Sequence, residues 1–223
     1  MSEFPGRTLV LRLDDATLAI ENTTLFSDLR FLTGLGVRPI VVAPSAQSAR
    51  SVVRLMNRTG DCAVGLSGAD AGMMPAKGGE QRGAVQTRLL LTLLGAGYVP
   101  VIEPLALGVF GADVAVAPDD VASALAQAVA ATRAIFFNGA GGVMDAHTRQ
   151  LIDELTPAEA LDLAESPTID VDLRAAIRAA ALGVRGGVEA AQIVDGRIAH
   201  ASIVEFLTAR HLGTQVAGTV FMS

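Results

Sequence analysis

Short β-prone runs alternate with helix-like segments along the whole chain, and this alternation constrains the fold more than any other feature. A strand that joins a parallel neighbour needs a long crossover, which is usually a helix. The pattern therefore predicts an α/β protein: a three-layer α/β/α sandwich with an open, mostly parallel sheet. We expect strands at 8–13, 38–42, 63–66, 99–102, 134–137 and 189–194, and helices at 23–35, 46–58, 85–94, 119–131, 156–165, 172–182 and 200–209.

Local signals support several of these boundaries. Thr156 stands three residues before Glu159, which is the spacing of a capping box, and Pro157 suits the first helical turn. Asp119 opens another expected helix, where its charge complements the helix dipole. Residues 215–221 are β-prone and favour a closing strand.

The composition fits one globular domain and excludes several partners. With 51% hydrophobic and 18% charged residues, the chain can bury a core. No low-complexity linker divides it, so we expect one domain over 1–223, with an N-lobe at about 1–107 and a C-lobe at about 108–223. The net charge of -6 argues against binding to nucleic acid or to an anionic membrane. A lone Cys62 and an N-terminus without an apolar signal core predict a cytoplasmic protein.

The basic residues are distributed unusually. Of the 17 basic residues, sixteen are arginine and one, Lys77, is lysine. A lysine supplies a compact, mobile point charge, whereas an arginine is a planar fork with fixed donors. Chemistry that requires a lysine ammonium is therefore limited to one position.

Glycine-rich turns after the expected strands could bring backbone N–H groups close to a ligand. Neither a GxGxxG nor a GxxxxGK[ST] pattern is present, and tight strand-to-helix turns also explain the glycines. The candidate ligand-binding residues of these turns are Gly65, Ser67, Gly68, Asn138 and Gly139.

Asp14 and Asp15 follow the first expected strand, at the sheet edge where α/β proteins bind ligands. They could bind a cation or accept hydrogen bonds from a ligand, or they could form an Asx-type turn with solvated carboxylates. The three histidines show no metal-ligand spacing, and no GxSxG motif is present. The sequence therefore predicts no metal site and no serine hydrolase.

Three blocks of sequence resemble the amino acid kinase family, in particular the N-acetylglutamate kinases. The resemblance covers nearly the whole chain and implies the amino acid kinase fold. It also implies transfer of the γ-phosphoryl group of ATP to a carboxylate, with Mg-ATP as cofactor if the chain is active. The blocks are 63–70 (AVGLSGAD), 94–102 (LGAGYVPVI) and 186–214, which contains GGVEAAQIVDGRIAH, EFLT and LGT.

The motifs that bind phosphate and substrate in the family are altered in this chain. The family's Lys-x-Gly-Gly corresponds to residues 12–15, so that Arg12 replaces the lysine and two aspartates replace the glycines. The family's His-Gly-Gly-Gly corresponds to residues 43–46, where Pro44 removes an amide donor and Ser45 adds a side chain. The substrate-binding lid that follows in the family is missing.

The C-terminal half departs from the family in the same way. Asp119 matches an organising aspartate of the family, but the two asparagines that precede it in the family are alanines here. The second family lysine falls near Ala176, with Arg174 and Arg178 beside it. The resemblance therefore makes Asp119, Arg12 and Arg174 the candidate catalytic residues, and Asp119 has an alternative role at a helix start.

A retained scaffold with altered phosphate motifs predicts a degenerate, pseudokinase-like protein. We expect it to bind a small ligand (N-acetylglutamate, arginine or a nucleotide) or to regulate a partner, with a link to arginine metabolism. The kinase-like domain of N-acetylglutamate synthases resembles the chain at 118–122 and 213–216. In arginine-sensitive family members the effector region corresponds to His200, Glu205 and Gly213. The alternative there is a helix-to-strand turn kept for folding.

Two other functions remain open. The first is an active acyl-phosphate kinase with a rebuilt site that uses Arg12, Asp119 and Arg174 or Arg178. The second is a structural subunit, either a homodimer or a heteromer with a true kinase. The apolar faces of 46–58 and 85–94 could form its interface, although such faces more often belong to the core.

Overall fold

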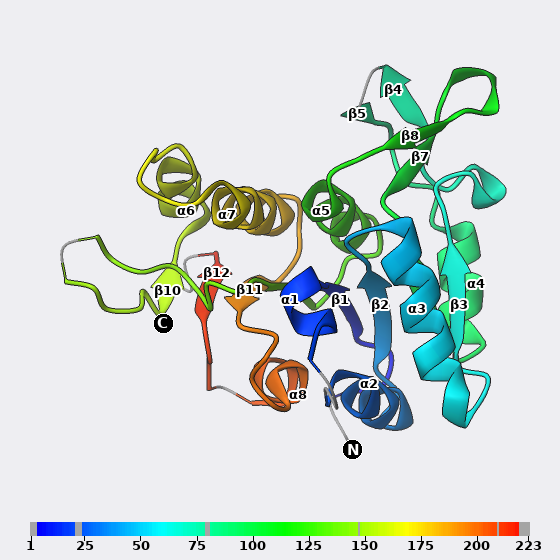
Figure 1. Ribbon diagram of the computed structural model, residues 1–223, viewed down its shortest axis with the longest axis horizontal. Coiled ribbons are helices and arrows are strands. Elements are labelled where there is room, and N and C mark those ends of the chain that lie inside the picture. The colour runs from blue at the N-terminus through cyan, green and yellow to red at the C-terminus, as the bar shows by residue number, and fades with distance from the viewer. Residues whose placement is uncertain (1–3, 21–23, 79–80, 147, 209, 219–223) are drawn as a thin grey trace.

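An eight-stranded sheet forms the centre of the molecule (Figure 1), with the strand order β10-β12-β11-β9-β1-β2-β6-β3. The computed structural model describes residues 4–20, 24–78, 81–146, 148–208 and 210–218. The strands of this sheet are β1 (Thr8–Arg12), β2 (Arg38–Val42), β3 (Ala63–Leu66), β6 (Val99–Ile102), β9 (Arg133–Phe137), β10 (Glu154–Leu155), β11 (Ala190–Val194) and β12 (Thr214–Ala217).

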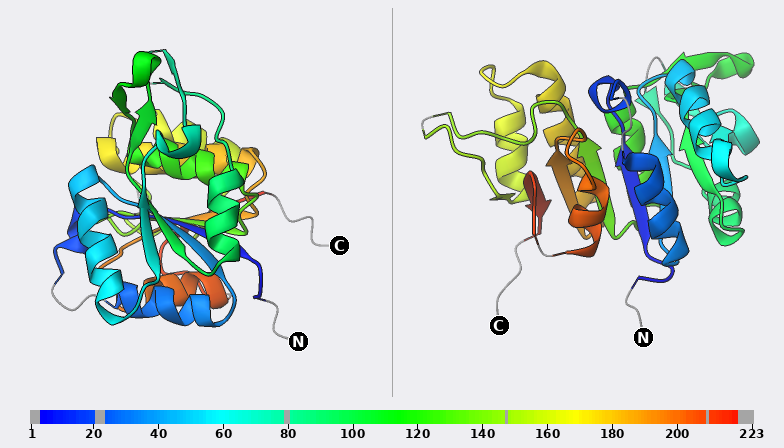
Figure 2. Two further views of the ribbon diagram at one scale, coloured as in Figure 1. Left: turned by 90° about the vertical axis from the view of Figure 1, so that its right-hand side faces the viewer. Right: turned by 60° about the horizontal axis from the view of Figure 1, so that its bottom comes forward.

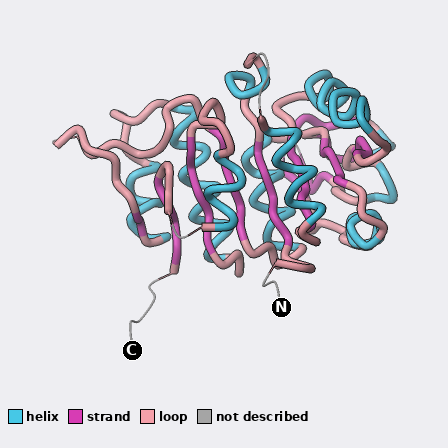
Figure 3. Tube along the Cα trace, turned by 90° about the horizontal axis from the view of Figure 1, so that it is seen from below, coloured by secondary structure: helices cyan, strands magenta, loops and turns pink. Residues whose placement is uncertain are grey.

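Neighbouring strands run parallel, except that β12 is antiparallel to β11. Seen from below in Figure 3, the strands lie side by side between the helices. Strand β1 pairs with β2 along one edge and with β9 along the other. The predicted mostly parallel, open sheet is confirmed.

Helices cover both faces of the sheet, so the predicted three-layer sandwich is also confirmed (Figure 2). One face packs against α4 (Arg88–Gly95), α5 (Pro118–Ala128), α6 (Pro157–Ala164) and α7 (Val171–Arg185), and the other against α2 (Leu25–Gly34), α3 (Ala46–Met56) and α8 (Ala201–Leu207).

Two apolar cores result from this arrangement, and the pleat of each strand divides its side chains between them. In β1, Val10 points into the core under α5 and α7, whereas Leu9 and Leu11 point into the core under α2 and α3. All three side chains are buried. A sheet that is buried on both faces explains why its strands are continuous apolar runs.

The predicted capping box at α6 is present. The backbone N–H of Thr156 donates to Glu159 Oε2 at 2.8 Å, and the N–H of Glu159 donates to Thr156 Oγ1 at 3.3 Å. Residues 157–164 form the helix that this signal predicts. Ser45 caps α3 in a similar way, because its hydroxyl accepts the N–H of Ser48 at 3.1 Å.

Several short elements were not predicted, because they are too short to show a period. They include two hairpins, and Lys77 lies exposed in the first of them rather than in a loop. The predicted strand at 215–221 is β12 as far as Ala217, and 219–221 lie outside the described residues. The additional elements are α1 (Asp15–Leu18), β4 (Ala76–Gly78), β5 (Gln81–Arg82), β7 (Leu105–Leu107), β8 (Asp113–Ala115) and 3₁₀ turns at Asn57–Thr59, Asp70–Gly72 and Val109–Gly111.

No helix in the described part of the chain is both long enough and apolar enough to cross a bilayer.

Candidate functional site

A cavity at the ends of the central strands lies beside β1. Strand β1 has β2 on one side and β9 on the other, so the strand order changes direction at β1. Open α/β sheets bind ligands at the carboxyl ends of the strands where the order changes direction in this way. A cavity of about 570 Å³ opens here, and we call it the carboxyl-edge cavity. It is lined by Arg12, Asp14, Asp15, Ala16, Pro44, Pro118, Asn138, Gly139, Ala140, Asp170 and Asp172.

Two of the candidate catalytic residues, Arg12 and Asp119, form an ion pair beneath this cavity. Arg12 Nη2 lies 2.8 Å from Asp119 Oδ2, and Arg12 Nη1 donates to the carbonyl oxygen of Phe137 at 3.0 Å. The two side chains are only 11% and 7% exposed. Burial raises the pKa of Asp119, and the neighbouring Arg12 partly opposes that rise.

The pair is not fully satisfied by the protein. Within the described part of the chain, Nε of Arg12 and Oδ1 of Asp119 are buried without a hydrogen-bond partner. Buried polar atoms are usually paired, so each of these atoms carries a desolvation cost. The ion pair therefore holds the end of β1 against the start of α5 at the expense of one donor and one acceptor.

Aspartates of the chain occupy the helix starts at this edge. Asp14 caps α1, because its Oδ1 accepts the N–H of Thr17 at 2.9 Å as well as the Thr17 hydroxyl. Asp170 caps α7, because its Oδ1 accepts the N–H of Asp172 at 2.9 Å. Asp119 lies in the first turn of α5. Asp14 and Asp170 thus each occupy a backbone N–H that could bind an anion, whereas the start of α5 has no side-chain cap.

The loop after β9 contributes Asn138 and Gly139 to the lining of the carboxyl-edge cavity. Asn138 is buried, and its Oδ1 accepts the N–H of Ala140 at 2.9 Å. Arg197 Nη2 donates to the carbonyl oxygen of Gly139 at 2.9 Å while Arg197 also pairs with Asp195. Hydrogen bonds from Arg197 lower the pKa of Asp195. This contact fixes the position of the loop at the cavity rim.

The other arginines of the predicted site lie elsewhere. Arg174 is on α7 but does not line the carboxyl-edge cavity, and its buried Nε has no hydrogen-bond partner in the described part of the chain. Arg178 pairs with Glu165 at 2.6 Å on the exposed side of the same helix. Among the described residues, neither Arg174 nor Arg178 makes a hydrogen bond or ion pair with Arg12 or Asp119.

Ser45 lies next to the carboxyl-edge cavity rather than in it. Together with Asp15 it lines a separate cavity of about 420 Å³ between α1 and α3. The hydroxyls of Ser45, Ser48 and Ser51 make this cavity polar, and none of its lining residues in the described part of the chain is cationic. Pro44, one residue earlier, lines the carboxyl-edge cavity and offers it no N–H group.

The residues of the glycine-rich turn after β3 have two different surroundings: some line a cavity, and one is packed against the backbone. Gly65 and Ser67 line a third cavity, which is described below. Gly68 is buried, and a Cβ atom there would lie 2.8 Å from Cα of Ala106 and 2.9 Å from the carbonyl oxygen of Met74. The close approach of the backbone is by itself enough to require a glycine here.

The C-terminal candidates His200, Glu205 and Gly213 are held by contacts within the protein. His200 Nδ1 lies 2.7 Å from Asp28 Oδ1. The Glu205 side chain is 0% exposed, and its carboxylate accepts the N–H of Leu212 at 2.6 Å and faces His211 Nδ1 at 3.2 Å. A Cβ atom at Gly213 would collide with the backbone of β11. These contacts match the alternative of a turn kept for folding.

Sequence reasoning missed part of the cavity lining. Asp170 and Asp172 precede and open α7, and the helix start at about residue 172 was the available signal. A further cavity of about 440 Å³ shares Ala140 and Asp170 with the carboxyl-edge cavity. Its lining includes the apolar side chains of Ile169 and Leu173.

Comparison with known proteins decides the family. A family model, that of the amino acid kinase family, matches residues 15–195. An acetylglutamate kinase of Gluconacetobacter diazotrophicus is 31% identical over 215 residues, which cover 88% of this chain and 68% of that protein. The chain belongs to the amino acid kinase family. An acetylglutamate kinase of Nautilia profundicola is 32% identical, over 92% of this chain and 75% of that kinase.

Solved structures agree with this family in fold. An N-acetylglutamate synthase from Neisseria gonorrhoeae, complexed with coenzyme A and L-arginine, superposes with a TM-score of 0.79 at 20% identity. The match covers 99% of this chain and 63% of the synthase chain, so this chain spans less than two thirds of the synthase. The predicted resemblance to both kinds of protein is confirmed.

Proposed function

We propose that this family member binds a small ligand and does not transfer phosphoryl groups by the family's usual route. The observation that carries the proposal is the set of aspartates at the helix starts around the carboxyl-edge cavity. Asp14 and Asp170 accept hydrogen bonds from the N–H groups of their own helices, where the phosphates of a nucleotide would need donors.

Charge supports the same conclusion. Among the described residues that line the cavity, Arg12 is the one cation, and its guanidinium is already paired with Asp119. Two unit charges about 4 Å apart near a protein surface interact by about 4 kcal/mol, so adjacent carboxylates strongly oppose a polyphosphate. The carboxylates that line the cavity are Asp14, Asp15, Asp170 and Asp172.

A magnesium ion would have to offset this repulsion. Among the described residues, no group of three or more histidine, cysteine or acidic side chains is placed to hold a metal ion. The side chains present therefore do not fit a metal on their own, and the proposal includes no step that depends on one.

Calorimetric titration tests the proposal directly. We expect no heat of binding when Mg-ATP is titrated into the native chain, and no ADP release in a coupled assay with N-acetylglutamate. The Asp14→Asn/Asp15→Asn variant keeps side chains able to cap α1 but removes two charges, so it should gain measurable affinity for Mg-ATP. Asp61→Asn/Asp113→Asn removes two exposed charges elsewhere and should gain none. Tight binding of Mg-ATP by the native chain would contradict the proposal.

An active acyl-phosphate kinase is the second candidate, and the Arg12–Asp119 pair favours it. That pair places a cation and a carboxylate beside the cavity, next to the apolar cavity at Ile169 and Leu173. Positioned charges are the main requirement of phosphoryl transfer. Turnover of an N-acylated amino acid would establish this candidate if Asp119→Asn abolishes it while circular dichroism shows that the variant is folded.

The proposed link to arginine and the proposed homodimer have separate tests. Glu205 is occupied by Leu212 and His211, so arginine should leave the melting temperature unchanged. On the two predicted interface faces, Leu55 of α3 and Leu91 of α4 are exposed apolar side chains, and they lie on opposite sides of the sheet. Light scattering of the native chain, of Leu55→Glu and of Leu91→Glu tests whether either face joins two copies.

A further inference from the structure

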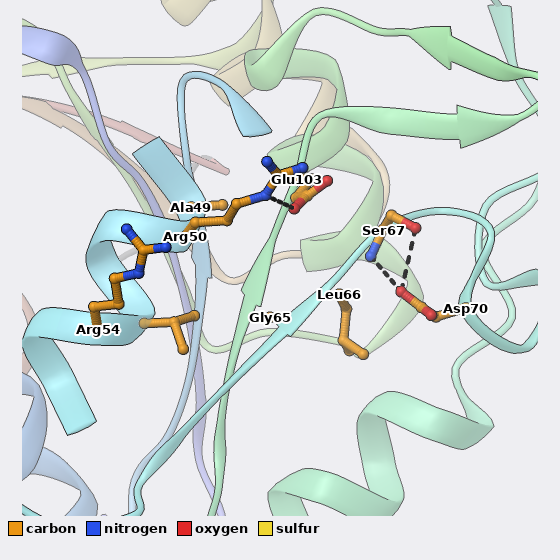
Figure 4. Close-up of a pocket in the computed structure, with 9 residues that line it drawn as sticks. Ala49, Arg50, Arg54, Gly65, Leu66, Ser67, Asp70 and Glu103 are labelled. Atoms are coloured by element: carbon orange, nitrogen blue, oxygen red, sulfur yellow. Dashed lines mark hydrogen bonds and ion pairs between the residues drawn. The ribbon is translucent and has the colours of Figure 1, made fainter. Parts of the chain in front are cut away.

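The cavity lined by Gly65 and Ser67 lies away from the carboxyl-edge cavity, where α3 crosses the edge strand β3. It has a volume of about 390 Å³, within the range of small-molecule sites, and we call it the α3–β3 pocket (Figure 4). Helix α3 forms one wall, β3 the floor, and the turns after β3 and β6 the opposite wall. It is lined by Ala49, Arg50, Val53, Arg54, Gly65, Leu66, Ser67, Asp70 and Glu103.

The wall formed by α3 is cationic. Arg50 and Arg54 are one helical turn apart, a spacing at which like charges repel each other. Arg50 is 68% exposed, and its Nε lies 3.7 Å from Glu103 Oε1. Arg54 is exposed and makes no hydrogen bond or ion pair with the described residues. Two guanidinium groups with unused donors therefore border one pocket.

The opposite wall is anionic and is held in place. The Glu103 side chain is only 17% exposed, although its ion pair with Arg50 is long. The backbone N–H of Glu103 donates to the carbonyl oxygen of Leu66 at 2.8 Å, which fixes the start of this wall. Asp70 Oδ2 accepts the N–H of Ser67 at 2.6 Å and the Ser67 hydroxyl at 3.2 Å.

The floor of the pocket contains a glycine that packing does not require. Gly65 has no left-handed backbone angle, and a Cβ atom there would meet only Val53 Cγ2, at an ordinary 3.5 Å. Glycine weakens a strand and often marks a place where a ligand or another backbone approaches closely. A larger side chain at Gly65 would fill space between the two charged walls.

We propose that the α3–β3 pocket binds a free α-amino acid. Its two arginines and two acids give the lining no net charge, which suits a zwitterion better than an anion or a cation. Arginine is well matched to a carboxylate, so Arg54 and Arg50 receive the ligand's carboxylate, and the poorly solvated Glu103 receives its ammonium group. The site is independent of whether the carboxyl-edge cavity binds a nucleotide.

Thermal unfolding of the native chain with each of the twenty common L-amino acids tests the proposal. Binding to the folded state raises the melting temperature, by about 2–4 °C per 1 kcal/mol in a chain of this size. We expect at least one amino acid to raise it. Titration calorimetry with that amino acid should then show at least about tenfold weaker binding to Arg54→Gln and to Glu103→Gln.

Matched variants and ligands distinguish this site from others. Gly65→Val should abolish binding by filling the floor, whereas Arg58→Gln removes a nearby exposed arginine outside the pocket and should leave affinity unchanged. Circular dichroism of each variant without ligand checks that it folds. The deaminated acid and the decarboxylated amine of the same amino acid should both bind more weakly. No shift with any amino acid, or equal binding of the deaminated acid, would overturn the proposal.

Discussion

The carboxyl-edge cavity and the α3–β3 pocket contain similar charged residues but use them differently. In the first, Arg12 is paired with Asp119, and Asp14 and Asp170 bind the backbone of the helices they cap. In the second, Arg54 has no partner among the described residues and Arg50 has only a long contact with Glu103. In the first region the charged groups mostly bind each other or the backbone, whereas in the second the two arginines keep donors available to a ligand.

This difference shows that the partners of a charged side chain, more than its position at a cavity, indicate whether it contributes to folding or to ligand binding. A buried ion pair restrains the chain and is costly to break, whereas an exposed guanidinium contributes little to stability. Substitutions in the carboxyl-edge cavity should therefore change the free energy of unfolding, and substitutions in the α3–β3 pocket should change binding with little effect on folding.

The largest expected effect is that of Asp119→Asn. The substitution leaves the buried Arg12 without its counterion, which should lower the free energy of unfolding by about 3–5 kcal/mol. Urea denaturation followed by circular dichroism measures it. The Arg12→Met/Asp119→Leu double variant removes both charges and should recover most of the loss. An ordinary substitution lowers the free energy of unfolding by about 1 kcal/mol. A smaller loss for Asp119→Asn would contradict the view that the charges of the carboxyl-edge cavity contribute more to folding than those of the α3–β3 pocket.

The second-largest expected effect is the difference in stability between two glycine-to-alanine variants, one in each region. In Gly196→Ala the new Cβ atom would collide with Thr17 Oγ1 and lie 2.8 Å from Phe137 Cγ, so the free energy of unfolding should fall by about 1–3 kcal/mol. Gly65→Ala meets only Val53 at 3.5 Å and should be neutral or stabilising, by up to about 1 kcal/mol. Thermal melts of both variants measure the contrast. Equal losses would show that the floor of the α3–β3 pocket is as tightly packed as the carboxyl edge.

The smallest effect concerns Asp195 and depends on pH. Hydrogen bonds from Arg197 hold the pKa of Asp195 below its ordinary value of 3.8. A lowered folded-state pKa stabilises the protein above the unfolded-state pKa, and this stabilisation is lost as the pH falls through the folded-state pKa. Asp195→Asn should therefore cost up to about 1 kcal/mol at neutral pH, because the pair is partly exposed.

Chemical denaturation of the native chain and Asp195→Asn across the acidic range checks this sign. The difference between the two proteins should shrink as the pH drops below about 4. A difference that grows on acidification would mean that another group is responsible.

The strands and most helices could be predicted because their signals are local. The run at 99–102 is apolar throughout and became β6, and Thr156 and Glu159 marked the start of α6 within four residues of sequence. The hairpin of β7 and β8 could not be predicted, because each strand has only three residues, too few to show a pattern in the sequence. The two strands pair with each other in antiparallel orientation.

The candidate site was predicted in its residue types and less well in its contacts. The resemblance to the family pointed to Arg12 and Asp119, which are far apart in sequence and meet only because β1 lies over the start of α5. It also pointed to Arg174, which lies away from that pair. The role of Asp14 as a cap was one of two alternatives, and only the position of Thr17 shows which of them the chain adopts.

The antiparallel strand β12 has a consequence for how the chain folds. It lies between β10 and β11 and is the strand with which β10 pairs in the described sheet. Residues 154–155 can therefore join the sheet only after 214–217 have docked, which requires closure of a long loop containing α6 and α7. Such non-local pairing is slow, so refolding kinetics should show this margin of the sheet forming late, after β1, β2 and β9 have associated.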